Sequence, residues 1–288
     1  MKRILKIGMD VHTTNYTLCA MEPIIGEDDR VFATIKVTPD YKNILMFIEN
    51  LKLKLGLNDE YDIQCGYEAG CLGYSLYNQL TAAGIKCVIL APTTMLTPQG
   101  VRIKTDMRDA YMIAQCLSYG GYHAVYIPTE DDDSVKEYLR MRNDHKLALK
   151  KIKQQINAFC IRHGFCYDGT KWTLSHLKWL KKLEITNGLY RETLDEYMAS
   201  YEEQEAKIER YDKRIEEIAE QTKYYDKVKK MKCFLGIKTH TALSLIVETG
   251  EFERFAKGNQ YASYLGLAPG ENSSSDSIHR LGITKAGN

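Results

Sequence analysis

The feature that most constrains the fold is a set of three apolar runs near the N-terminus, joined by short connections. The runs cover residues 4–11, 16–22 and 31–37 and have the residue types and lengths of β-strands. Parallel neighbours need a crossover of a dozen or more residues, so connections this short join antiparallel strands. The chain therefore begins with three antiparallel strands.

Helix and strand patterns alternate after these strands. Residues 41–55 read as a helix whose apolar positions fall on one face. The elements expected next are a strand at 61–68, a helix over about 72–83, a strand at 85–91 and a helix beginning near Thr105. This order predicts the α/β class, with a mixed sheet in a first domain covering residues 1–130.

A long 3-4 periodicity marks the middle of the chain. Its positions are Leu194, Tyr197, Tyr201, Gln204, Ile208, Tyr211, Ile215, Ile218, Thr222 and Tyr225. Only Gln204 and Thr222 are non-aromatic polar residues, so the pattern predicts a coiled-coil seam. The seam is expected to pack on the preceding helix or to pair with a second subunit. It belongs to a predicted helical arm at 131–230, followed by a C-terminal domain at 231–288 whose stretch 234–252 reads as two helices around a glycine turn.

Charge is unevenly distributed although the chain of 288 residues has a formal net charge of only +1. Residues 136–182 carry twelve Lys or Arg and three Asp or Glu, whereas residues 192–226 carry five and twelve. The basic block is either a solvated helical face or a surface that binds nucleic-acid phosphates. The best candidates for such contacts are Arg140, Arg142, Lys146, Lys150, Lys151 and Lys153.

Cysteine usage and hydropathy indicate a cytoplasmic protein. The eight cysteines include no CxxC pair, and several lie in strand-like apolar runs, which suits reduced thiols better than disulfides or a zinc site. No stretch reaches the roughly 18 apolar residues of a membrane span. We therefore expect no membrane association.

Four carboxylates occupy positions that the expected fold can bring together. Asp10 ends the first strand, Glu68 ends the fourth, and Asp106 and Asp109 share a face at the start of the last helix of the domain. Acidic residues also favour any helix start, so the last two have a purely structural alternative. If all four meet, oxygen ligands of this kind select Mg²⁺ or Mn²⁺. Two such ions can act on a phosphodiester.

The segments "GMDVH", "YEAG" and "KTDMRDA" resemble the RuvC-like, ribonuclease-H-fold DEDD domain of bacterial insertion-sequence transposases of the IS110 family, recombinases guided by a bridge RNA. "FLGIKTHTALSLIVETGEFERF" is similar to the helix-hairpin-helix stretch of that family. "YLGLAPGENSSSDSIHRLGITKAGN" is similar to its C-terminal transposase motif. The resemblance covers nearly the whole chain and includes a coiled coil between the two parts.

The resemblance implies a nucleophilic serine in the loop after "GLAP", which matches Ser274, with Ser273 and Ser275 as neighbouring alternatives. It implies that the metal site of Asp10, Glu68, Asp106 and Asp109 activates a scissile phosphate while the serine attacks. Lys104, next to the acidic pair, is a further candidate phosphate contact.

Two departures from the family pattern bear on this serine. Ser275 stands where a glycine is usual, and the chain stops at Asn288, where the family continues with further helices, so the C-terminal domain is expected to be incomplete.

The expected function is that of a DNA transposase acting on donor and target DNA, with a guide RNA, as a homodimer or tetramer assembled through the coiled coil. Two alternatives stay open. One is a metal-dependent nuclease resembling a Holliday-junction resolvase, which cuts with water and forms no covalent link to DNA. The other is an inactive nucleic-acid-binding remnant.

Overall fold

The computed structural model describes residues 3–24, 28–56, 61–95, 105–271, 273 and 279–283. The chain divides into two compact units, Met1–Ile127 and Pro128–Asn288, and each is described by itself. Lys104, Ser274 and Ser275 lie outside the described residues. All eight cysteines are free thiols. No helix in the described ranges is long and apolar enough to cross a membrane.

The first unit is built on a five-stranded sheet of order β3-β2-β1-β4-β5. Its strands are β1 (Arg3–Val11), β2 (Tyr16–Glu22), β3 (Arg30–Val37), β4 (Tyr61–Glu68) and β5 (Lys86–Leu90). β1, β2 and β3 pair antiparallel, whereas β4 pairs parallel with both β1 and β5. The expected mixed α/β sheet is therefore confirmed.

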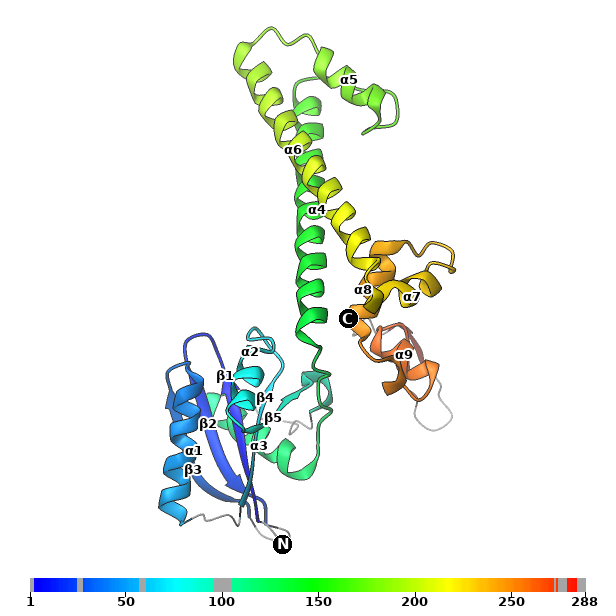
Figure 1. Cartoon of the computed structure of the whole chain (residues 1–288). Helices are drawn as coiled ribbons and strands as arrows, with labels where there is room; N and C mark the ends of the chain where they lie inside the picture. The colour runs from blue at the N-terminus through cyan, green and yellow to red at the C-terminus, as the bar shows by residue number, and fades with distance from the viewer. Residues whose placement is uncertain are drawn as a thin grey trace. The chain divides into compact units, whose positions relative to one another are not determined.

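The two faces of the sheet have different helical covers (Figure 1). Helices α1 (Tyr41–Leu55) and α2 (Ser75–Ala82) bury apolar side chains with Leu5, Ile7 and Met9 of β1. The buried stripe of α1 is the one expected from the sequence: Ile44, Phe47, Ile48 and Leu51. Helix α3 (Asp106–Tyr119) packs its apolar face with Leu90 of β5, whose side chain points to the opposite face. The 3-10 turn η1 (Pro92–Thr94) follows β5.

Two glycines let α3 lie directly on the strands. A Cβ atom at Gly8 of β1 would come within 2.1 Å of the Ala110 carbonyl oxygen and 2.3 Å of the Ala114 amide nitrogen. At Gly66 of β4 a Cβ would come within 2.7 Å of the Leu117 side chain. The helix backbone thus occupies the space that a side chain of β1 would fill.

The second unit is mainly helical. Its helices are α4 (Glu130–Arg162), α5 (Leu174–Lys182), α6 (Gly188–Ala219), α7 (Thr222–Met231), α8 (Thr239–Thr249) and α9 (Gly258–Tyr264), with the 3-10 turn η2 (Phe252–Arg254). The short strands β6 (Pro269–Glu271) and β7 (Arg280–Ile283) pair antiparallel. Helices α4 and α6 run side by side, with α5 between their connected ends (Figure 1). We call α4, α5 and α6 the arm.

The predicted seam packs within the chain. Leu194 and Tyr201 are buried with residues of α4 in one cluster, and Ile215 and Ile218 in another. The polar seam residue Gln204 accepts a hydrogen bond from His145 of α4 at 2.9 Å when Nδ1 carries the proton. Of the two expected arrangements, packing on the basic helix is the one observed.

The seam is not continuous to its predicted end. Helix α6 ends at Ala219, and α7 begins a separate helix at Thr222. Tyr225 is 49% exposed and so does not continue the apolar face. Repeating apolar positions on both sides of the break mimic one helix, because a short interruption can preserve a 3-4 spacing.

The C-terminal stretch also differs from its prediction. It contains one helix, α8, preceded by a turn in which Gly236 adopts a φ of +86°. Helix α8 shares a buried cluster with α4, α6 and α7, whose members include Leu139, Ile215 and Leu243. The expected pair of helices around a glycine turn is wrong, because the first of them, α7, ends before this stretch begins.

The close approach of α3 makes Gly8 the most demanding position in the sheet. We expect Gly8→Ala to lower the free energy of unfolding by about 1–3 kcal/mol or more, because the methyl group forces α3 away from β1. Gly70→Ala is the matched control, since a Cβ there meets nothing closer than 3.8 Å. Urea unfolding of the two variants measures the difference, and equal midpoints would contradict this account of the packing.

Candidate functional site

Strand register places Asp10 and Glu68 on the face of the sheet that α3 covers. Side chains alternate along a strand, so Asp10 shares a face with Gly8, and Glu68 shares a face with Gly66. Gly8 pairs with Gly66 across the parallel strands, and the last pair of the ladder is Met9 with Tyr67. Asp10 and Glu68 are the next residues, so both carboxylates emerge at the carboxyl ends of adjacent strands.

Helix α3 brings the other two carboxylates to the same end. Asp106 precedes Ala110 by one helical turn, about 5.4 Å, and Asp10 follows Gly8 by two strand residues, about 6.6 Å. Because Ala110 lies against Gly8, the two steps lead to the same place. Asp109 shares the helical face with Asp106.

The start of α3 also has an ordinary helix cap. The Thr105 hydroxyl accepts a hydrogen bond from the Arg108 amide, and Asp106 and Asp109 lie in the first turn. Negative charge is favourable there because free amide groups and the helix dipole point toward it. The structural reason for an acidic pair is therefore real, and it does not conflict with a role in the cleft.

A cleft of about 520 Å³ opens between these elements. The four predicted carboxylates, Asp10, Glu68, Asp106 and Asp109, all line it. His12 lines it too, with Nδ1 3.4 Å from Asp10 Oδ1. Asp10 is more enclosed than Asp106: its side chain is 15% exposed, against 43% for Asp106.

Lys36 of β3 is a member of the site that the sequence analysis missed. Its ammonium group lies 2.8 Å from Asp106 Oδ2 and donates a hydrogen bond to it. That hydrogen bond, together with the charge of Lys36, lowers the pKa of Asp106. Lys36 follows from the strand register, since it pairs with Thr17, which in turn pairs with Asp10.

Thr17 is the second residue that the sequence analysis missed. It is fully buried, and its hydroxyl finds no hydrogen-bond partner among the described residues. Directly opposed residues of an antiparallel pair carry their side chains on the same face. Thr17 therefore places a buried, unsatisfied hydroxyl on the side of the sheet where Asp10 lies, and only the pairing register reveals it.

The four carboxylates of the cleft suit a hard divalent cation, although their side chains are not arranged around one. Four carboxylates from three separate elements face one cleft, and oxygen ligands of this kind select Mg²⁺ or Mn²⁺. Within the described ranges, no group of three or more His, Cys, Asp or Glu side chains is placed to hold a metal ion. Asp106 is instead engaged by Lys36.

The structure divides the six predicted basic contacts of α4 into two groups. Arg142 donates two hydrogen bonds to Asp212, at 2.7 and 3.0 Å, and Lys153 lies 3.8 Å from Glu205. Arg140 contacts Glu137 and Glu248. The remaining three, Lys146, Lys150 and Lys151, are exposed and form no ion pair with any described residue.

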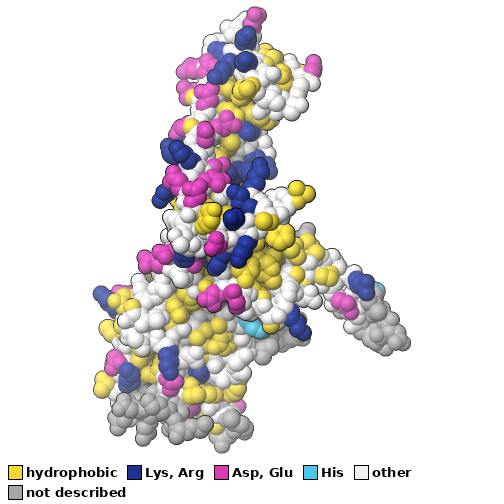
Figure 2. Space-filling model, turned by 45° about the vertical axis from the view of Figure 1, so that its right-hand side comes forward, with side chains coloured by type: hydrophobic (Ala, Val, Ile, Leu, Met, Phe, Trp, Pro, Cys, Tyr) yellow, Lys and Arg dark blue, Asp and Glu magenta, His cyan; other side chains and the backbone are white. Residues whose placement is uncertain are grey.

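Charged side chains of both signs therefore alternate along the arm, as the face drawn in Figure 2 shows. Much of the basic block neutralises acidic residues of the same unit. Only the second group, Lys146, Lys150 and Lys151, is available as it stands for phosphate groups of a ligand.

Of the three candidate serines, Ser273 alone is described. Its hydroxyl donates a hydrogen bond to Glu271 at 2.8 Å and accepts one from the His279 amide at 3.3 Å. Ser274, the residue implied by the family resemblance, lies outside the described residues, as does Lys104.

Two family profiles match the chain. One, described as a transposase of the DEDD type in IS110 elements, matches residues 7–160. The other, the transposase IS116/IS110/IS902 family, matches residues 229–288. Both candidate regions, the acidic cleft and the serine loop, fall within these matches.

Curated relatives agree. The chain is 33% identical over 262 residues to the transposase for insertion sequence element IS1533 of Leptospira borgpetersenii, covering 90% of this chain and 73% of the relative. It is 32% identical to the putative transposase y4qE of Sinorhizobium fredii, covering 77% of this chain and about half, 54%, of the relative.

A solved structure of Thermus thermophilus RuvC with a Holliday junction substrate matches 42% of this chain and 99% of its own. The identity is 11% and the TM-score is 0.29, too low to establish a shared fold. The family profiles and the IS1533 relative are sufficient by themselves, and the chain belongs to the IS116/IS110/IS902 family of transposases, enzymes that cleave and transfer DNA strands.

Proposed function

We propose that the cleft between β1, β4 and α3 is where this transposase cleaves the DNA of an insertion sequence. The observation that carries the proposal is that Asp10, Glu68, Asp106 and Asp109 come from three separate elements and line one cleft. The strand order, with β2 alone running against the other four, supports the ribonuclease-H-like, RuvC-like assignment of this unit.

The four carboxylates would hold Mg²⁺ or Mn²⁺, in our proposal two ions. Bound there, the ions would supply positive charge to the scissile phosphate and lower the pKa of the attacking hydroxyl. The protein's part is to position the ligands. Packing of α3 on Gly8 fixes the helix that carries Asp106 and Asp109, and the strand ends fix Asp10 and Glu68.

Lys36 gives this cleft a resident positive charge. While no ion is bound, its ammonium neutralises the charge of Asp106, which reduces the electrostatic repulsion among the four carboxylates. If Asp106 served as a metal ligand, the ion and the Lys36 ammonium would compete for the same carboxylate. A released Lys36 could then contact a phosphate oxygen of the DNA.

The proposed nucleophile is Ser274, on the strength of the family resemblance. Its hydroxyl oxygen attacks phosphorus, a phosphoserine bond forms, one ester bond of the DNA breaks, and the serine proton ends on the leaving oxygen. Rejoining reverses these steps on another strand. This sequence of steps distinguishes a transposase from a nuclease, in which water attacks and no link to the protein forms.

Binding of donor DNA, target DNA and a guide RNA is proposed for the free basic residues of α4, Lys146, Lys150 and Lys151. Such residues position a phosphate backbone without reading its sequence.

A homodimer or tetramer formed through the arm is also part of the proposal. Because α4 already covers the α6 seam, such an assembly would use outward residues, for example Leu189 of α6, which is 68% exposed.

Trapping of a covalent intermediate tests the proposed function. Incubation of the chain with labelled donor DNA and Mg²⁺ should yield a protein–DNA adduct that survives denaturation, and Ser274→Ala should abolish it. Ser273→Ala is the neighbouring control and should retain most of the adduct. Cleaved DNA without an adduct would indicate the hydrolytic nuclease, and neither cleavage nor adduct would indicate the non-catalytic remnant.

A Mg²⁺ titration of thermal stability tests the metal site separately. A ligand that binds only the folded state raises its melting temperature, here by about 5 °C or more at saturation. The double variant Asp106→Asn/Asp109→Asn should lose this response.

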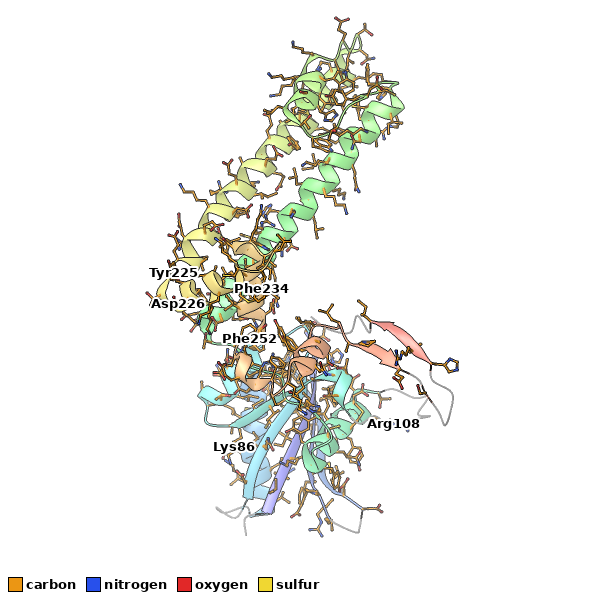
Figure 3. The ribbon with its side chains drawn as sticks, turned by 90° about the vertical axis from the view of Figure 1, so that its right-hand side faces the viewer. Lys86, Arg108, Tyr225, Asp226, Phe234 and Phe252 are labelled. Carbon is orange, nitrogen blue, oxygen red and sulfur yellow. The ribbon has the colours of Figure 1, made fainter. Side chains whose placement is uncertain are left out.

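Asp62→Asn is the matched control for that titration. Asp62 lies at the opposite end of β4 from Glu68 and pairs with Lys86 at 2.7 Å, so its loss should leave the response intact. Figure 3 shows Lys86 well away from Arg108, which marks the start of α3. An equal response in all three proteins would contradict the assignment of the site.

Competition between Lys36 and the metal has its own test. We expect Lys36→Met to lower the Mg²⁺ concentration at the midpoint of the thermal shift by about two- to fivefold, the range expected for an exposed ion pair. Lys86→Met, which breaks an equally short pair on another part of the sheet, should leave the midpoint unchanged. A higher midpoint in Lys36→Met would show that Lys36 assists metal binding and does not oppose it.

A further inference from the structure

The far end of the arm encloses a second cavity, of about 130 Å³, between α4, α5 and the loop that joins them. Four aromatic side chains line it: Phe165, Tyr167, His176 and Trp179. The ring centroids of the last three lie 4.8 to 5.7 Å apart, and the rings of His176 and Trp179 are nearly parallel, at 19°. The side chains of Asn157 and Lys171 line it as well.

The cavity has the size and lining to take one flat ring. An engineered protein cavity of about 150 Å³ with apolar walls binds benzene, so about 130 Å³ admits a ring of pyrimidine size. Aromatic side chains stack on nucleic-acid bases whatever their sequence. Asn157 adds an amide that can both donate and accept hydrogen bonds.

His176 adds a buried donor to the wall. It is 2% exposed, and its Nδ1 accepts a hydrogen bond from the Trp172 amide at 3.1 Å. Burial and the charge of Lys171 lower the pKa of His176, so the ring is neutral and its proton is on Nε2. No hydrogen bond to Nε2 occurs within the described part of the chain, which leaves this donor for an acceptor such as a base carbonyl.

The residue that orients His176 is itself strained. Trp172 has a φ of +66°, in the left-handed region that residues other than glycine seldom adopt. Its ring stacks on Tyr201 of α6 at 5.3 Å, and the Lys153 ammonium lies 5.3 Å from both rings. Strain of this kind persists only where the surroundings enforce it, and it often marks a ligand site.

The basic face of α4 leads to this cavity. Asn143, Lys146, Lys150, Lys153 and Asn157 follow each other at the 3-4 spacing of one helical face. The first four line a groove on α4, and Asn157 lines the cavity at the arm's end. A strand held by its phosphates along the groove would reach the cavity with the bases that follow.

We infer that the cavity lined by Tyr167, His176 and Trp179 binds an unpaired pyrimidine base of single-stranded nucleic acid whose backbone follows the basic face of α4. This site is separate from the acidic cleft and provides stacking in place of catalysis. It rests on the proposed binding of nucleic acid by α4. DNA and RNA share the recognised chemistry, a flat base beside a phosphate, and the experiment separates them.

The two tryptophans of the chain, Trp172 and Trp179, both lie at this end of the arm, so tryptophan fluorescence, excited selectively over tyrosine, reports on it alone. The full chain is titrated with a 12-residue oligothymidine, the matching oligouridine and an abasic oligonucleotide of equal charge, with anisotropy of a terminal label as the measure of binding. We expect both base-bearing strands to quench the tryptophan emission and the abasic strand to bind without quenching.

Variants distinguish contacts with the base from contacts with the phosphate backbone. Trp179→Leu should weaken oligothymidine binding by about tenfold, the usual effect of losing one stacked base, and leave the abasic strand unaffected. Trp179→Phe, which keeps a ring, should bind nearly as well as the wild type. Leu174→Ala is the matched control on α5, because Leu174 is 78% exposed and does not line the cavity, so this variant should bind every strand as the wild type does.

The triple variant Lys146→Gln/Lys150→Gln/Lys151→Gln tests the proposed phosphate contacts of α4. This variant should bind all strands more weakly, by a similar factor for each. The slope of log K against log salt concentration should become shallower by about 0.7 per lysine. Equal affinity for thymidine and abasic strands with unchanged fluorescence would overturn the pocket while leaving nucleic-acid binding intact. Absence of binding by any strand at low salt would overturn both. Tighter binding of oligouridine would identify RNA as the ligand, and tighter binding of oligothymidine would identify DNA.

Discussion

The contact between α3 and Gly8 of β1 is the constraint on which the acidic cleft depends. Any side chain at Gly8 would occupy the place of the Ala110 carbonyl and the Ala114 amide, so only glycine allows the helix to lie this close. Asp106, one helical turn before Ala110, and Asp10, two strand residues after Gly8, are therefore brought to the same end of the cleft. A backbone contact without charged side chains thus determines where the charged residues of the site meet.

The arm depends on a different balance, in which polar groups fix the pairing of two long helices. Arg142 with Asp212 and His145 with Gln204 join α4 to α6 between two apolar clusters. A single apolar seam tolerates shifts in register, whereas a buried polar pair out of register would lose its partner. Such contacts within the arm engage some of the basic side chains of α4. The sequence alone therefore predicted more unpaired basic residues than the structure has.

Much of the fold followed from sequence because its signals are local. The stripe of α1, the bounds of β2 and β4, and the carboxylates at the strand ends all depend on periodicity and on short connections. Lys36 and Thr17 were missed because their relevance arises from strand register, which has no local signal. The break between Ala219 and Thr222 was missed because the 3-4 spacing continues across it.

The distribution of charge explains how a nearly neutral chain can handle a polyanion. The acidic cleft would repel phosphate unless cations occupy it, and Lys36 and the proposed divalent ions are the two sources of such charge at that site. In our proposal the exposed lysines of α4 bind the same phosphates. The proposal therefore assigns binding of the backbone and chemistry on it to different units of the chain. A variant that loses one of these functions should keep the other, which is why the experiments on the cleft and on the arm give independent answers.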